Sequence, residues 1–185
     1  SWALVQKVVS SDIAVNDQFG SSVAVSGDVV VVGSRLDDDA GVSSGSAYLF
    51  ARNQGGVNNW GQLKKLVASD AAAGDQFGFA ASISGDAVLI GAPDDIRDGL
   101  KTGSAYLYGR NEGGTNNWGQ IKKLVSSNGG GGDEFGASVS IDGENLIVGA
   151  HFYDFSGIDT GAAYIFARNQ GGTNNWGELK SIVSP

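Results

Sequence analysis

The sequence predicts an all-β protein built from three copies of one unit. Three observations support this: the stretch 17–34 recurs at 75–92 and 133–150, each copy contains four short apolar segments, and glycine is abundant while proline is scarce. The 185 residues include 30 glycines and two prolines, a composition typical of many tight turns. Self-similarity at a fixed period indicates a repeat architecture. With 41% hydrophobic residues the chain has enough apolar surface to fold.

The spacing of the aromatic residues shows that no insertion interrupts the repeat. Equivalent side chains stand 58 residues apart throughout, and the opening of a fourth unit ends the chain. We therefore expect one repeat domain over residues 1–185, in which these side chains have structural roles. They are Trp2, Trp60, Trp118 and Trp176, Phe19, Phe77 and Phe135, and Tyr48, Tyr106 and Tyr164.

In the first unit the four apolar segments are expected to be strands. Residues 19–25 and 29–33 are joined by Ser26-Gly27-Asp28, a short link typical of a β-hairpin. The second segment is β-branched almost throughout, as expected for a strand covered on both faces. Residues 45–52 follow a ten-residue loop, and residues 60–67 follow a loop rich in Asn and Gly. The lysines of the last segment place it at the sheet edge.

Four short antiparallel strands in a unit of about 58 residues match one blade of a β-propeller. Blades are expected at residues 17–67, 75–125 and 133–183. Residues 2–9 are then a surplus outer strand, belonging to a blade whose inner strands are missing. Because propellers usually close with about four to eight blades, we expect a homo-oligomer, a dimer completing a six-bladed ring, or a segment of a longer array.

The motifs themselves resemble FG-GAP repeats, the blades of integrin-α-like propellers and of related bacterial and fungal proteins. The resemblance rests on Phe19-Gly20, Phe77-Gly78 and Phe135-Gly136, followed by Gly91-Ala92-Pro93 and by Gly-Ser-Ala-Tyr. It implies a propeller with an extracellular or cell-surface setting and a role in adhesion or ligand binding. Many such repeats hold calcium between the first two strands. The link here, Ser26-Gly27-Asp28 or its counterparts, has too few oxygens, so that site is not expected.

The units differ most in the ten residues after the GA motif, at 35–44, 93–102 and 151–160. Divergence confined to loops on a rigid scaffold favours a ligand site, although drift in solvated loops gives the same pattern. An aromatic cluster in the third loop suits stacking on a sugar or a partner surface, or packing beside a neighbouring blade. The candidate ligand-binding residues are Arg35, Asp94, Asp95, Arg97, Phe152, Tyr153 and Phe155.

Carboxylates in the same loops suggest a possible Ca²⁺ site, because calcium prefers oxygen ligands. Their spacing does not match an EF-hand, and acidic turn residues are common in acidic proteins. The candidate metal ligands are Asp37, Asp38, Asp39, Asp94, Asp95 and Asp98.

The Asn- and Trp-containing loops at residues 52–60, 110–118 and 168–176 also admit two interpretations. Amide groups beside a flat aromatic ring resemble a carbohydrate-binding groove. Their near identity in all three units instead favours a structural turn, because a structural need is the same in every blade.

The composition of the chain excludes several classes of function. A net charge of −8 leaves no basic surface for nucleic acid, and the absence of cysteine excludes thiolate chemistry. No apolar run is long enough to span a membrane. His151 is the only histidine and does not recur, so we expect no enzyme. Two functions remain: a binding module for a glycan or surface protein, or a self-assembly element that joins copies through terminal strands and blade edges.

Overall fold

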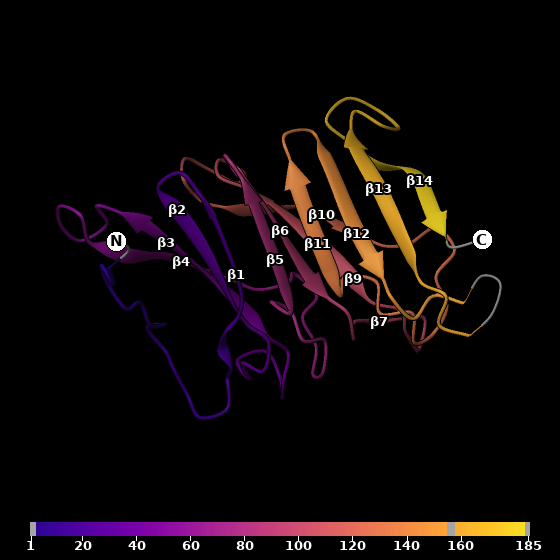
Figure 1. Ribbon diagram of the computed structural model, residues 1–185, viewed down its shortest axis with the longest axis horizontal. Coiled ribbons are helices and arrows are strands. Elements are labelled where there is room, and N and C mark those ends of the chain that lie inside the picture. Colours follow the sequence, from indigo (N-terminus) through magenta and orange to yellow (C-terminus); the bar gives the residue numbers. More distant parts are fainter. Residues whose placement is uncertain (1–2, 155–157, 184–185) are drawn as a thin grey trace.

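The computed structural model describes residues 3–154 and 158–183, and twelve of its fourteen described strands form three four-stranded antiparallel sheets, blades 1 to 3 (Figure 1). Blade 1 contains β1 (Phe19–Ser26), β2 (Val29–Ser34), β3 (Ser46–Arg52) and β4 (Trp60–Leu66) in spatial order. Blade 2 contains β5 (Ala80–Ser84), β6 (Ala87–Ala92), β9 (Ser104–Gly109) and β10 (Gly119–Leu124). Blade 3 contains β11 (Ser138–Asp142), β12 (Asn145–Ala150), β13 (Ala162–Arg168) and β14 (Trp176–Val183). The predicted all-β repeat architecture is confirmed.

The turn between the first two strands shows why the sequence forms hairpins. Ser26 pairs with Val29, so that Gly27 and Asp28 alone make the turn. Gly27 has a φ of 56°, in the left-handed region that glycine adopts without steric cost. The chain therefore reverses in two residues, and β1 and β2 stay in register up to the turn.

Each blade has two apolar faces because side chains alternate along its strands. The front face points to the preceding blade and the back face to the following one. Val31 and Leu49 on the back of blade 1 share a core with Ile83 on the front of blade 2. Leu89 on the back of blade 2 shares a second core with Ile141 on the front of blade 3. The two cores thus stack the blades in a row.

Each repeated phenylalanine packs the edge of its ring against the repeated tyrosine of its own blade. The ring centroids are 5.5 Å apart for Phe19 and Tyr48, with the planes at 65°. The corresponding distances in blades 2 and 3 are 5.5 Å and 5.2 Å. This edge-to-face geometry is favourable for aromatic rings and fixes the start of the first strand against the third.

Glycines allow consecutive blades to touch backbone to backbone. A Cβ on Gly33 would lie 2.0 Å from the carbonyl oxygen of Gly78, and one on Gly91 would lie 1.9 Å from that of Gly136. Gly45 forms an isolated parallel bridge with Phe77 in the next blade. The glycines of the repeated motifs are therefore required by the approach of neighbouring blades.

The surplus outer strand predicted at residues 2–9 was wrong for the part that the structure describes: residues 3–9 form no strand. They run along β4, where Gln6 Nε2 donates to Asn59 Oδ1 over 3.2 Å and Gln6 Oε1 accepts from the Trp60 amide over 2.9 Å. Trp2 lies outside the described residues. A strand needs a neighbour for its backbone groups, and the inner strands that would pair with this segment are absent from the chain.

Candidate functional site

The three variable loops lie along one edge of the row of blades, the lower edge in Figure 1. Residues 35–44, 93–102, 151–154 and 158–160 are called the loop rim here. The loops of blades 1 and 2 contact the linker that enters the next blade: Gly74 N donates to Val42 O over 2.8 Å, and Gly132 N donates to Lys101 O over 2.6 Å. The rim therefore continues from one blade to the next.

One backbone hydrogen bond closes each loop in the same way. The amides of Gly45, Gly103 and Gly161 donate to the carbonyl oxygens of Asp37, Asp95 and Tyr153 over 2.9, 3.1 and 2.9 Å. The base of the loop is thus common to all three blades while its sequence differs.

The second loop contains a hairpin that the sequence analysis missed, made of β7 (Ile96–Arg97) and β8 (Leu100–Lys101). Its turn residues Asp98 and Gly99 have φ values of 53° and 82°. Asp-Gly is a preferred pair where both turn residues need positive φ, so that dipeptide was the available signal.

Beneath the first loop, the Lys65 ammonium is surrounded by three carboxylates. Its Nζ lies 2.8 Å from Asp12, 2.9 Å from Asp37 and 2.5 Å from Asp39. The Tyr48 hydroxyl lies 2.8 Å from carboxylate oxygens of both Asp12 and Asp37. Because these residues join the linker, the loop, β3 and β4, the cluster fixes the loop base to the outer half of the blade.

These contacts shift the pKa values of Asp12, Asp37 and Lys65 in the direction that favours the charged form of each group. Burial opposes ionisation of Asp37, but hydrogen bonds from Lys65 and Tyr48 outweigh it and lower its pKa. The pKa of Asp12 is lowered by the same partners against a similar burial effect. Burial also opposes protonation of Lys65, yet its hydrogen bonds to the carboxylates raise its pKa overall. Asp12, Asp37 and Lys65 are therefore charged at neutral pH.

Blade 2 repeats this cluster with Lys123, which lies 2.7 Å from Asp70 and 2.6 Å from Asp95. The Tyr106 hydroxyl donates to Asp70 over 2.9 Å. Hydrogen bonds from Lys123 and Tyr106 lower the pKa of Asp70 although burial acts to raise it. The two blades thus use the same ionic contacts.

Blade 3 holds the same place together without charges. Asn128 Nδ2 donates to the Tyr153 hydroxyl over 2.7 Å, and the Tyr164 hydroxyl donates to Asn128 Oδ1 over 2.9 Å. Ser181 occupies the position of Lys65 in the repeat. Blade 3 thus replaces the lysine and its carboxylate partners by neutral residues at the same time. This joint replacement indicates that the contacts are structural.

The candidate metal ligands do not form a calcium cage. Carboxylate oxygens of Asp12, Asp37 and Asp39 lie within 4.8 Å of one another, but the Lys65 ammonium lies among them. A calcium ion would have to displace this lysine, and the ion needs six to eight oxygen ligands. The residues present therefore do not fit Ca²⁺.

The remaining acidic candidates have other partners or lie apart. Asp94 accepts from Gln76 over 2.7 Å and pairs with Lys101 at 3.2 Å, and Asp38 accepts from the Ser43 amide over 2.7 Å. Asp98 is exposed at the β7–β8 turn. The structure brings Asp37 and Asp39 together but not the full predicted set.

The candidate ligand-binding residues fall into buried and exposed groups. Tyr153 is buried and bonded to Asn128, whereas Phe152 is exposed and its ring contacts that of His151, with centroids 3.9 Å apart and planes tilted by 44°. Arg35 donates to Gln18 over 2.8 Å. Tyr153 is therefore unavailable for stacking on a sugar.

The candidates Arg97 and Asp95 have partners within the chain. The Arg97 guanidinium reaches the Ser126 carbonyl oxygen at 3.5 Å, and Asp95 is held by Lys123 and Ser104. Phe155 lies outside the described residues.

Of the exposed apolar side chains on the loop rim, only Phe152 was singled out from the sequence. Every loop has at least one, and isolated apolar residues within otherwise polar loops were the available signal. They are Val42 in the first loop, Ile96 and Leu100 in the second, and Phe152 and Ile158 in the third.

The Asn-containing loops make contacts that link blades. The Asn58 amide donates to Asn53 Oδ1 over 2.8 Å, and equivalent bonds recur in blades 2 and 3. Lys64 Nζ donates to Asn117 Oδ1 in the next blade over 3.0 Å, and Lys122 does the same to Asn175 over 2.6 Å. The lysines of the outer strands thus hold the following blade.

Arg168, Asn174 and Glu144 line a hollow of about 510 Å³ beside Trp176. Arg168 donates to Asn174 Oδ1 over 2.6 Å and lies 3.5 Å from Glu144. These three side chains are thus engaged with one another, which agrees with a structural role for this loop.

Stacked four-stranded antiparallel blades with equivalent loops at one rim define a propeller-type repeat protein. Within that class, the FG-GAP repeat model matches residues 2–50, 60–108 and 118–166. The chain therefore belongs to the FG-GAP repeat family, as the motifs indicated. Such propellers are generally non-enzymatic binding modules, typical of extracellular or surface proteins. No curated protein matches the chain, and the described residues contain no helix able to cross a membrane.

Proposed function

We propose that the chain is a non-enzymatic, extracellular binding module that contacts a partner protein through the loop rim. The observation that carries this proposal is the exposure of apolar side chains on all three variable loops. Larger apolar patches rimmed by polar residues mark interaction surfaces, and we infer that these side chains act together because all three loops lie along one rim. The common closing hydrogen bond holds the loops on a rigid scaffold, as binding loops require.

A protein surface fits this rim better than a glycan. Sugar recognition commonly uses open aromatic faces, but Tyr153 is buried and Phe152 is in contact with the tilted ring of His151. Val42, Ile96 and Leu100 offer aliphatic contact instead. Aliphatic side chains bury apolar area against another protein, which favours association.

Binding of the fluorescent chain to intact cells tests the proposal, with trypsin-treated and periodate-oxidised cells as parallel arms. We expect trypsin to remove the binding and periodate to leave it. The double variant Ile96→Ser and Leu100→Ser should bind at least about tenfold more weakly, because two apolar contacts are lost. Thr115→Arg, an exposed change in another loop of the same blade, serves as the control.

Two results would contradict the proposal. One is binding that survives trypsin but not periodate, together with hits on a glycan array, which would identify a sugar ligand. The other is equal binding by the double variant and the wild type, which would place the contact away from the second loop.

A further inference from the structure

The inner half of the front face of blade 1 is uncovered although it carries the same pattern as the covered front faces. On the outer half of this face Val32, Tyr48 and Phe50 are buried, and Val8 packs against them. Val25 is 65% exposed, whereas Ile83 and Ile141 at the same position of blades 2 and 3 are 7% and 6% exposed. Gly20 has open space where a Cβ would project, while a Cβ on Gly78 would lie 2.2 Å from a carbonyl oxygen of blade 1. Blade 1 therefore has the front face of an internal blade without its neighbour.

The back face of blade 3 is uncovered in the same way. Ile147 is 39% exposed, whereas Val31 and Leu89 at this position are fully buried at 0%. On the outer strand Ile182 is 48% exposed, while its two counterparts are 1% exposed. Ser138, Ile147 and Gly149 line a hollow of about 170 Å³ on this face. In the other blades the following blade fills this place.

The internal interfaces show which polar groups join one blade to the next. Serines on back faces bond to the backbone of the following first strand or its turn, and three of these bonds serve as the reference here. Ser22 Oγ donates to Gly78 O over 2.8 Å, Ser82 Oγ accepts from Ile141 N over 3.1 Å, and Ser84 Oγ accepts from Gly143 N over 3.2 Å.

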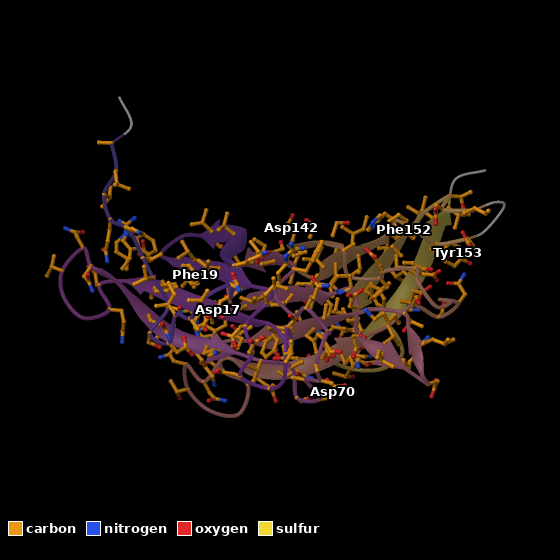
Figure 2. The ribbon with its side chains drawn as sticks, turned by 90° about the horizontal axis from the view of Figure 1, so that it is seen from below. Asp17, Phe19, Asp70, Asp142, Phe152 and Tyr153 are labelled. Atoms are coloured by element: carbon orange, nitrogen blue, oxygen red, sulfur yellow. The ribbon has the colours of Figure 1, made fainter. Side chains whose placement is uncertain are left out.

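Blade 3 keeps a suitable group at each of these three positions. Ser138, Ser140 and Asp142 stand where Ser22, Ser82 and Ser84 stand in their own repeats. The side chain of Asp142 is exposed, and Figure 2 shows it on the inner-strand side of the row, opposite Asp70. Blade 3 is therefore equipped to hold a following first strand.

The outer strands also carry matching donor and acceptor groups. Lys64 and Lys122 each donate to an asparagine of the next blade. Lys180 is their counterpart in blade 3, and Asn59 of blade 1 is the counterpart of the two asparagines. One open face thus carries the donor and the other carries the acceptor.

We propose that the back face of blade 3 binds the front face of blade 1 in a second copy of this chain. Two such head-to-tail contacts close a ring of two chains and six blades, within the usual range for propellers. Ser138, Ser140 and Asp142 bond to Gly20 O, Val25 N and Gly27 N of the other copy. Val25 and Ile147 lose their exposure, as their counterparts have done.

The segment 3–9 lies near the place that the second copy requires. Gln6 contacts Asn59, the residue that Lys180 of the other copy would bind. Displacing the segment loses the packing of the half-buried Val8 against Val32, Tyr48 and Phe50, but its other residues are exposed. In contrast, β14 has seven paired positions with β13. We therefore expect β14 to remain in its blade and residues 3–9 to move aside.

Native mass spectrometry at about 50 μM, a concentration at which micromolar contacts persist, tests the proposal. The wild type should have twice the 18.9 kDa mass of one chain. Val25→Arg and Ile147→Arg should each be monomers, because each blocks one member of every contact. Both positions are exposed, so the blades should still fold. Thr115→Arg on the middle blade is the matched control and should remain dimeric.

Mixing the two variants separates head-to-tail from like-to-like pairing. Val25→Arg keeps an intact back face and Ile147→Arg keeps an intact front face, so the mixture should recover a dimer held by one native contact. A dimer of either variant alone would overturn the proposal. So would a monomeric wild type, an open series of larger assemblies, or loss of the dimer when residues 1–9 are deleted.

Discussion

At the scale of single residues, the same position in the blade is held in two chemically different ways. Lys65 and Asp37 are both largely buried, with side chains 18% and 3% exposed, while Ser181 and Tyr153 take their places in blade 3. A buried carboxylate that loses its cation keeps its desolvation cost. The ionic contacts of blade 1 are therefore needed together, although blade 3 fills the same positions with a neutral set.

Lys65→Met should lower the free energy of unfolding by about 3 kcal/mol, because Asp37 is left as an unpaired buried charge. Adding Asp12→Asn and Asp37→Tyr, with serine at position 65, transfers the blade 3 set and should recover most of the loss. Urea unfolding followed by circular dichroism measures both, with the exposed Lys7→Met as control. A triple variant no more stable than Lys65→Met would contradict the interpretation.

The contacts of single side chains are also the feature that the sequence predicts least well. The sequence marks the loops that hold Asp37 and Asp95 as variable, but it does not show that these carboxylates pair with lysines. Their lysine partner lies 28 residues further along the chain in each case, and no local pattern links them. Comparing the three units position by position would have shown that Asp12, Asp37 and Lys65 change together.

At the scale of elements, most of the fold was predictable, because strands depend on local patterns. The segments 19–25, 29–33, 45–52 and 60–67 agree with β1 to β4 to within one residue at each end. The segment 2–9 failed for a physical reason. Its sequence matches an outer strand, but strand formation depends on a neighbouring strand that the chain does not contain.

Glycine substitutions test the backbone contacts between blades. Gly91→Ala should cost about 3 kcal/mol of stability, because its Cβ would meet the Gly136 carbonyl oxygen and force the blades apart. Gly149→Ala should cost less than about 1 kcal/mol, because its Cβ meets Ser138 Oγ, which can rotate away. Both are made in Ile147→Arg protein and measured by urea unfolding. Equal losses would show that blade contact is not the cause.

At the scale of the whole molecule, three stacked blades leave one partly uncovered face at each end. Figure 2 shows Phe19 toward the blade 1 end, and Phe152 and Tyr153 at the blade 3 end. Phe19 is only half-buried, whereas Phe77 and Phe135 are fully buried. The sequence predicted that the ring was incomplete. It did not predict that the faces, rather than the terminal strands, offer the matching contacts.

Native-state amide exchange at Gly27 tests this central claim most directly. The amides of Gly85 and Gly143 donate to serines of the preceding blade, and Gly27 should donate to Asp142 of the other copy. In the wild type we predict protection of Gly27 within about tenfold of those two amides, falling by at least about tenfold in Ile147→Arg. Fast exchange of Gly27 in both proteins, with Gly85 and Gly143 protected, would contradict the account.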